Sequence, residues 1–121
     1  MDARQVIKQL CAGWINKDNN AIAELFGESG RFTDPLHERT LVGADDVRAT
    51  NQPAVDDLTD IGIDLFWILG NEERAVAEGR MVATSLTNGT RLDFEFVMVA
   101  ETQDGHLLRV TEYFDTNPLL P

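Results

Sequence analysis

Hydrophobic residues near the N-terminus recur at spacings of three and four positions, the pattern typical of an amphipathic helix. The residues that would share one face of this helix are Val6, Ile7, Leu10, Cys11, Trp14 and Ile15. Polar residues at 17–19 interrupt the pattern, and a second, shorter helix is predicted over residues 19–28. Asn19 or Asn20 is suited to cap that helix, and Gly27 lies near its end.

A short strand is predicted over residues 30–36, ended by Pro35 because proline cannot donate a backbone hydrogen bond. Residues 44–58 have a helical pattern, and Pro53 is expected to kink or end that helix. The rest of the chain alternates between apolar and polar positions, which predicts strands. These strands cover residues 60–71, 74–89, 90–101 and 103–116.

Two dipeptides predict tight hairpin turns between the long strands. Asn88 with Gly89 and Asp104 with Gly105 are the residue pairs that such turns favour. The order of elements is two helices, a strand, a third helix and then long antiparallel strands. We therefore predict a single α+β domain over residues 1–121, with its helices on one face of the sheet.

Alternation along the strands divides their side chains between two faces of the sheet. In the last strand Glu112 shares the apolar face and is its lone carboxylate. The apolar residues of that face are Leu108, Val110 and Phe114, and the matching faces of the two preceding strands hold Ala75, Ala77, Gly79, Met81, Ala83, Leu92, Phe94, Phe96 and Met98. Small residues in the first of these strands suit a cavity wall, whereas the phenylalanines suit either a pocket lining or the core.

Composition narrows the range of partners. The chain carries 21 acidic against 10 basic residues, a formal net charge of −11. Phosphate groups would be repelled, so neither nucleic acid nor an anionic membrane is an expected partner. A small, neutral, apolar molecule is the ligand class that this charge balance favours.

Cysteine and histidine usage gives further expectations. Cys11 is the single cysteine and lies in an apolar helical stretch, so core packing and a reducing compartment are expected. The N-terminus has no signal-peptide pattern and no segment has transmembrane length, which predicts a cytoplasmic protein. His37 and His106 are scattered, so we expect no metal site and no cofactor.

Two stretches give the chain a resemblance to a known superfamily. They are "KDNNAIAELFGESGRFTDP" at 17–35 and "NGTRLDFEFVMVAETQDGHLLRVTEYFD" at 88–115. Together with the order of elements, they resemble the nuclear transport factor 2-like superfamily, in its ketosteroid isomerase, limonene epoxide hydrolase and SnoaL-like cyclase branches. The resemblance implies a cone-shaped fold (the cystatin-like type) in which a curved, mixed, mostly antiparallel sheet wraps about three helices around an internal apolar cavity. It also implies a homodimer formed through the sheet.

The resemblance to ketosteroid isomerases places a catalytic base at Asp34. In those enzymes a carboxylate moves a proton beside a carbonyl, and hydrogen-bond donors stabilise the resulting oxyanion. The positions of the two donors correspond here to Leu10 and Val97, which cannot donate. The usual constellation for steroid isomerisation is therefore incomplete.

The resemblance to limonene epoxide hydrolases places one catalytic carboxylate at Glu112. Their arginine and second carboxylate correspond to Gly79 and Met81, so that triad is also incomplete. SnoaL-like cyclases resemble the chain more loosely, but their aldol ring closure requires only an acid/base carboxylate, which Glu112 or Asp34 supplies without a cofactor.

The prediction is a SnoaL-like enzyme that uses carboxylate acid/base chemistry, of isomerase or cyclase type, on an apolar carbonyl-bearing molecule. Asp34 and Glu112 are the candidate catalytic residues. His37 is either a loop residue in solvent or a residue at the cavity rim that pairs with Asp34 or orients the ligand. The candidate ligand-binding residues are Leu10, Trp14, His37, Met81, Phe94, Phe96, Val110 and Phe114. The alternative is a binding or dimerisation module that has kept the fold without the chemistry.

Overall fold

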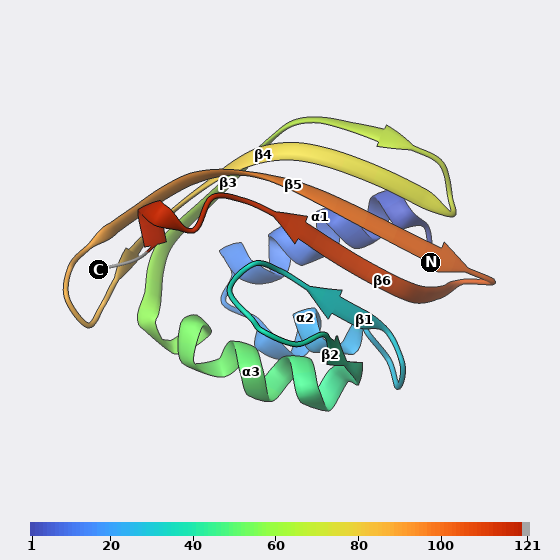
Figure 1. Ribbon diagram of the computed structural model, residues 1–121, viewed down its shortest axis with the longest axis horizontal. Helices are drawn as coiled ribbons and strands as arrows, with labels where there is room; N and C mark the ends of the chain where they lie inside the picture. The colour runs from blue at the N-terminus through green and yellow to red at the C-terminus, as the bar shows by residue number, and fades with distance from the viewer. Residues whose placement is uncertain (120–121) are drawn as a thin grey trace.

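The computed structural model describes residues 1–119 (Figure 1). Three helices, six strands and a short C-terminal 3-10 turn follow one another along this part of the chain. The helices are α1 (Ala3–Ile15), α2 (Asn19–Glu24) and α3 (Gly43–Asp57), and the 3-10 turn is η1 (Asn117–Leu119). The strands are β1 (Arg31–Thr33), β2 (Leu41–Val42), β3 (Leu58–Gly70), β4 (Arg74–Ser85), β5 (Arg91–Gln103) and β6 (His106–Tyr113).

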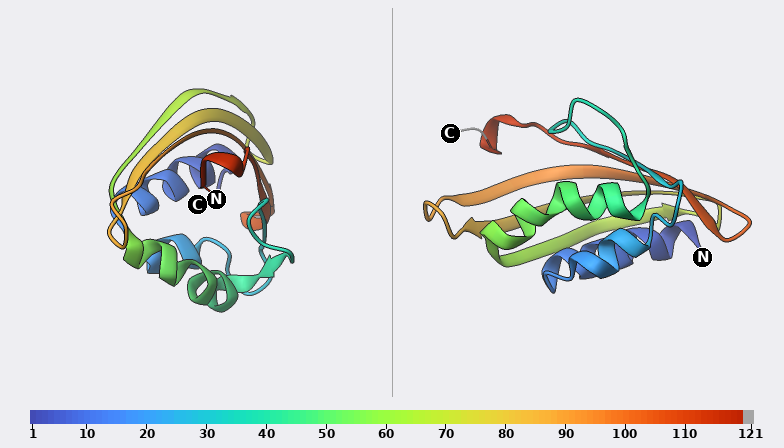
Figure 2. Two further views of the ribbon diagram at one scale, coloured as in Figure 1. Left: turned by 60° about the vertical axis from the view of Figure 1, so that its left-hand side comes forward. Right: turned by 90° about the horizontal axis from the view of Figure 1, so that it is seen from below.

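All six strands form one sheet in the order β2-β1-β6-β5-β4-β3. Strand β1 runs parallel to β6, and every other pair is antiparallel. The sheet curves over the helices, with α3 on the far side from β4 and β5 (Figure 2). This is the α+β architecture that the sequence predicts, a curved and mostly antiparallel sheet around three helices.

The core lies between α1 and the concave face of the sheet. Val6, Ile7 and Leu10 are almost completely buried there, because the periodic apolar face of α1 turns toward the strands. Ala75, Ala77 and Ala100 are buried opposite them, and their small side chains let the helix lie close to β4 and β5. At this level α1 therefore packs directly on the strands.

Several local predictions differ from the structure. Asp18, rather than Asn19 or Asn20, caps α2, since its carboxylate accepts a hydrogen bond from the Ala21 N–H at 3.1 Å. Strand β2 is an element that the sequence did not predict. Of the two effects expected of Pro53, ending the helix is wrong, since α3 continues past the proline to Asp57.

The apolar face of β6 also differs at one position. Leu108 was expected to face inward, but it is 43% exposed while Leu107 is buried. The pairing of β5 with β6 shifts register between Glu101 and Thr102, next to the hairpin turn, and this irregularity interrupts the alternation. From Val110 onward the face follows the prediction, and Glu112 lies on the inner side.

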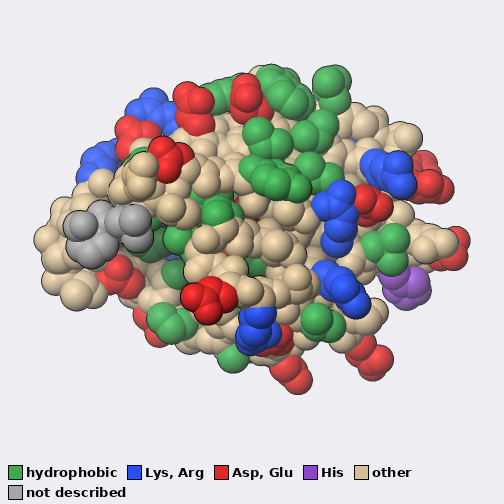
Figure 3. All heavy atoms as spheres, in the orientation of Figure 1, with side chains coloured by type: hydrophobic (Ala, Val, Ile, Leu, Met, Phe, Trp, Pro, Cys, Tyr) green, Lys and Arg blue, Asp and Glu red, His purple; other side chains and the backbone are tan. Residues whose placement is uncertain are grey.

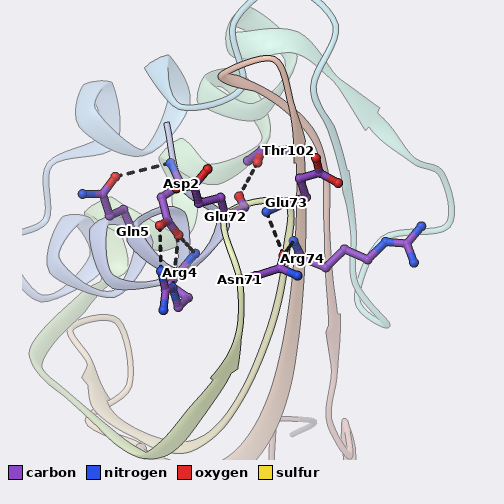
Figure 4. A network of polar contacts seen from close by, with 8 residues as sticks. All are labelled: Asp2, Arg4, Gln5, Asn71, Glu72, Glu73, Arg74 and Thr102. Atoms are coloured by element: carbon purple, nitrogen blue, oxygen red, sulfur yellow. Dashed lines mark hydrogen bonds and ion pairs between the residues drawn. The ribbon is translucent and has the colours of Figure 1, made fainter.

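Polar contacts close the end of the molecule where α1 begins (Figure 4). Asp2 and Gln5 form a reciprocal capping box on α1. The Ala3 N–H donates to the Glu72 carbonyl at 2.7 Å, and the Thr102 hydroxyl donates to the same carbonyl at 2.7 Å. The start of α1 is thereby fixed to the β3–β4 turn and to the end of β5.

Candidate functional site

A pocket of about 340 Å³ opens between α3, the loop after β1 and the concave face of β4, β5 and β6. Its volume lies near the lower end of the range for small-molecule sites, roughly 300–1,000 Å³. Most of its wall is apolar or aromatic. The apolar residues on the wall are Trp14, Phe32, Leu36, Ala54, Leu58, Ile63, Met81, Leu92, Phe94, Phe96, Met98, Phe114 and Leu119.

Asp34 lies on this wall directly after β1 and is only 9% exposed. Its Oδ1 accepts hydrogen bonds from the N–H groups of Leu36 at 2.8 Å and His37 at 3.0 Å, which forms a turn typical of aspartate before proline. The His37 ring lies at 2.8 Å from the same oxygen. Three groups therefore fix Oδ1, while Oδ2 has no hydrogen-bond partner within residues 1–119.

His37 pairs with Asp34 through its Nδ1 atom. An ionised carboxylate only accepts hydrogen bonds, so Nδ1 carries the proton in this pair and Nε2 is the second ring nitrogen left for other contacts. The His37 side chain is 28% exposed and borders the pocket. The structure thus favours the reading in which His37 pairs with Asp34 over that of a loop residue in solvent.

Glu112 lies on the inner face of β6 and also borders the pocket. Burial raises its pKa to about 8, and the nearby negative charge of Asp34 adds to this shift. No hydrogen bond to the Glu112 carboxyl group occurs in the described part of the chain. Glu112 is therefore a neutral carboxylic acid at pH 7, and its O–H is free to donate to a ligand.

Polar side chains also line the helical wall. Asn51 of α3 is 7% exposed and borders the pocket, as do Thr50 and Asp57. Asp57 is occupied by hydrogen bonds from Ser85 and Thr87 at the β4–β5 turn, which lower its pKa. Cys11 contributes a buried thiol, whose pKa is raised to about 12 by burial and by Glu112, so it stays protonated.

Six of the eight predicted ligand-binding residues lie on the pocket wall: Trp14, His37, Met81, Phe94, Phe96 and Phe114. Leu10 and Val110 do not. Both are buried in the closed core, at 2% and 0% exposure, because α1 packs directly on the sheet at their level. Asp34 and Glu112 border the same pocket.

Sequence reasoning missed the helical wall, above all Asn51. A signal for it exists: Val47, Asn51 and Val55 follow one another at four-residue spacing, so an amide stands on the buried face of α3. Cys11 was interpreted as core packing, and it is buried as well as next to the pocket.

Residues 1–119 were also compared with the requirements of a metal site and of a membrane-spanning helix. Among residues 1–119, no cluster of three or more His, Cys, Asp or Glu residues is arranged to hold a metal ion. The helices of this part of the chain all fall short of the length and apolarity that crossing a membrane requires.

The fold and the pocket define a cone-shaped α+β domain of the nuclear transport factor 2-like type. The chain belongs to the SnoaL-like domain family, whose model matches residues 7–110. Among curated proteins, no sequence matches that of this chain.

Solved structures of similar fold come from several bacteria. A hypothetical protein of Catenulispora acidiphila with a ketosteroid isomerase-like fold, in complex with trimethylamine, is 13% identical over 96% of this chain and 89% of its own, with a TM-score of 0.83. A proposed polyketide cyclase of Xanthomonas campestris is 16% identical over 97% and 93%, with a TM-score of 0.83. An LEH-like epoxide hydrolase of M. tuberculosis is 14% identical over 94% and 83%, with a TM-score of 0.76. At these identities the likeness establishes the fold and leaves the chemistry to the residues of the pocket.

Proposed function

We propose that this protein catalyses proton transfer, of the isomerase or cyclase type, on a small apolar molecule that bears a carbonyl group. The observation that carries the proposal is the pairing of two different carboxyl groups at one pocket. Asp34 is held by three donors on one oxygen, whereas Glu112 has a pKa raised to about 8. An ionised carboxylate next to a neutral carboxylic acid supplies both the base and the acid of such a reaction.

In the proposed reaction Asp34 takes a proton from the carbon beside the carbonyl. The electrons of the broken C–H bond form a carbon–carbon double bond, and negative charge develops on the carbonyl oxygen. Glu112 donates its O–H to that oxygen, the function for which Leu10 and Val97 have no suitable group. Asp34 then returns the proton to another carbon, which completes an isomerisation. Alternatively, the enolate carbon bonds to a second carbonyl carbon and closes a ring, and the oxygen of that carbonyl takes the proton back from Asp34.

The proposal can be tested before the substrate is known, by following exchange of the acidic α-protons of the bicyclic ketone β-tetralone in D₂O by NMR. The wild-type protein should accelerate exchange above the buffer rate. Asp34→Asn should reduce the acceleration about 100-fold or more, and Glu112→Gln about tenfold, because an amide still donates a weaker hydrogen bond. Glu95→Gln is the matched control, since Glu95 is exposed on the outer side of β5.

The pH dependence of this exchange sharpens the test. Once Glu112 loses its proton above about pH 8, the protein-catalysed rate should fall by about tenfold per pH unit, whereas Glu112→Gln should show no such fall. Wild-type exchange no faster than in buffer alone, over the whole pH range, would contradict the catalytic proposal.

The second candidate function is a binding module with the same pocket. Leu10 and Val97 favour it, because the two donor positions of related isomerases are apolar here. In that case β-tetralone would bind, as seen by NMR shift changes, and neither carboxylate variant would change the rate of exchange. The two candidates therefore differ in one measurement.

We also propose that the chain forms a homodimer through the outer face of the sheet, in a reducing compartment such as the cytoplasm. Large apolar side chains are exposed there, including Leu69, Trp67 and Tyr113. Hydrophobic side chains gather over β3 and β4 in the space-filling view (Figure 3). Sedimentation equilibrium should give twice the chain mass, and Leu69→Asp should shift the population toward monomers; a monomeric wild type would exclude this assembly.

A further inference from the structure

Asn51 is a largely buried residue whose amide makes no hydrogen bond within residues 1–119, and whose amide atoms are not fully enclosed because they adjoin the pocket. It projects from the face of α3 that also carries Val47 and Val55, is only 7% exposed, and borders the pocket. A buried polar group is normally paired, because its removal from water is otherwise uncompensated. Asparagine is also a poor helix former, so the local structure of α3 gives no reason for this residue.

Asn19 provides the contrast on the neighbouring helix. It is equally buried, but its Nδ2 donates to the Arg48 carbonyl at 2.9 Å and to the Gln52 Oε1 at 2.8 Å. These bonds connect α2 to α3 through the Asn19 Nδ2 alone, since the enclosed Asn19 Oδ1 has no partner among residues 1–119. Asn19 does not line the pocket, whereas Asn51 does, so of these two amides Asn51 is the one placed to contact a ligand there.

We propose that Asn51 binds a second oxygen of the ligand, and that the ligand is therefore an apolar ketone with a hydroxyl or a second carbonyl at some distance from the reacting carbonyl. This inference rests on the proposed function, which places the reacting carbonyl beside Asp34 and Glu112. An amide both donates and accepts, so it recognises either kind of oxygen and has no preference for an ion. The apolar wall between these groups suits an apolar ring body.

The placement of the elements supports two separate polar contacts. Glu112 lies on β6 in the sheet, and Asn51 lies on α3, which the curved sheet faces from across the pocket (Figure 2). Asp57 also lies on the helical wall, but its carboxylate already accepts hydrogen bonds from Ser85 and Thr87, so it is less available than Asn51 to bind a ligand. A ligand held at both walls would be fixed in orientation, which is what selective proton transfer requires. Asn51 is thus assigned as a positioning residue.

The test compares β-tetralone with its monohydroxylated ring derivatives, using NMR titration to measure each Kd. Wild-type protein should bind at least one hydroxylated derivative about tenfold more tightly than β-tetralone itself. Asn51→Leu has nearly the same shape without the amide, so it should abolish this preference, and the hydroxylated derivative and β-tetralone should then have equal Kd values. The thermal stability of this variant should stay close to that of the wild type, because no hydrogen bond within residues 1–119 is lost.

Asn19→Leu is the matched control. It should lower thermal stability by removing two hydrogen bonds and leave the preference for the hydroxylated derivative intact. The inference is overturned if no hydroxylated derivative binds more tightly than β-tetralone to the wild type, or if Asn51→Leu keeps the preference. Proton exchange on β-tetralone by the wild-type protein is a separate measurement that uses no hydroxylated ligand, so its presence or absence judges the proposed function independently of Asn51.

Discussion

Polar side chains occur both at the end of the molecule where α1 begins and in the pocket, but the two regions differ in how these side chains are paired. At the first, Asp2, Gln5, Asn71 and Thr102 all bond to partners within the chain (Figure 4). At the pocket, neither Glu112 nor Asn51 has a hydrogen-bond partner among the residues described.

Polar side chains therefore have different roles in the two regions. Groups paired inside the chain hold elements together and contribute to the free energy of folding. Groups that are buried beside a cavity without a partner cost stability and are suited to bind something else. The comparison can be tested at single residues, because substitution should have opposite effects on stability at the two ends.

The largest expected effect is at Glu112. Its pKa is raised in the folded state from about 4.5 to about 8, so the folded protein holds this proton more tightly than the unfolded chain. Stability from this group is fully present below about pH 4.5 and is lost as pH rises through about 8. With allowance for solvent reaching the pocket, the loss is about 3 kcal/mol.

Glu112→Gln should remove this loss, so that the variant is more stable than the wild type at pH 8–9 and similar near pH 4.5. Urea denaturation at both pH values measures the difference. Glu95→Gln, on the exposed face of β5, should follow the wild type at each pH. If Glu112→Gln loses stability at pH 8–9, the carboxyl group is paired after all and the comparison fails.

The next largest effect is expected at Thr102, where substitution should lower the free energy of unfolding, whereas substitution of Glu112 should raise it at pH 8–9. Thr102→Val keeps the shape but removes the hydroxyl that donates to the Glu72 carbonyl at 2.7 Å, at a buried position. We expect a loss of about 1–2 kcal/mol in the free energy of unfolding, measured by urea denaturation, and no change in the Kd of β-tetralone. Thr84→Val on β4 is the control, and equal stability of the two variants would contradict a structural role for the Thr102 hydroxyl.

The sequence was sufficient for the fold because the signals involved are local. The periodicity of Val6, Ile7 and Leu10, the alternation in β4 and β5, and the turn residues Asn88 and Asp104 all act within a few positions of the chain. Even here the register shift beside the hairpin reversed Leu107 and Leu108, since a bulge depends on pairing with the neighbouring strand.

The site was predicted less completely, for a reason that is also physical. Glu112 was recognised as a lone carboxylate on an apolar face, but its protonation depends on burial and on Asp34, which lies 78 positions away in the sequence. Whether Leu10 faces a cavity or a closed core is decided by how closely α1 approaches the sheet. These properties arise only when distant segments pack, so a pattern along the chain does not contain them.

The smallest effect is expected at His37. Its substitution tests whether His37 only positions Asp34 or is itself the catalytic base. Its ring pairs with Asp34 Oδ1 at 2.8 Å, while two backbone N–H groups hold the same oxygen. His37→Gln removes only one of three contacts, so β-tetralone exchange should slow about threefold, less than 1 kcal/mol in activation free energy. The Kd of the ketone should remain unchanged, and substitution of the exposed His106 should have no effect. A loss as large as that of Asp34→Asn would instead identify the His37 ring as the group that takes the proton, with Asp34 as its positioning partner.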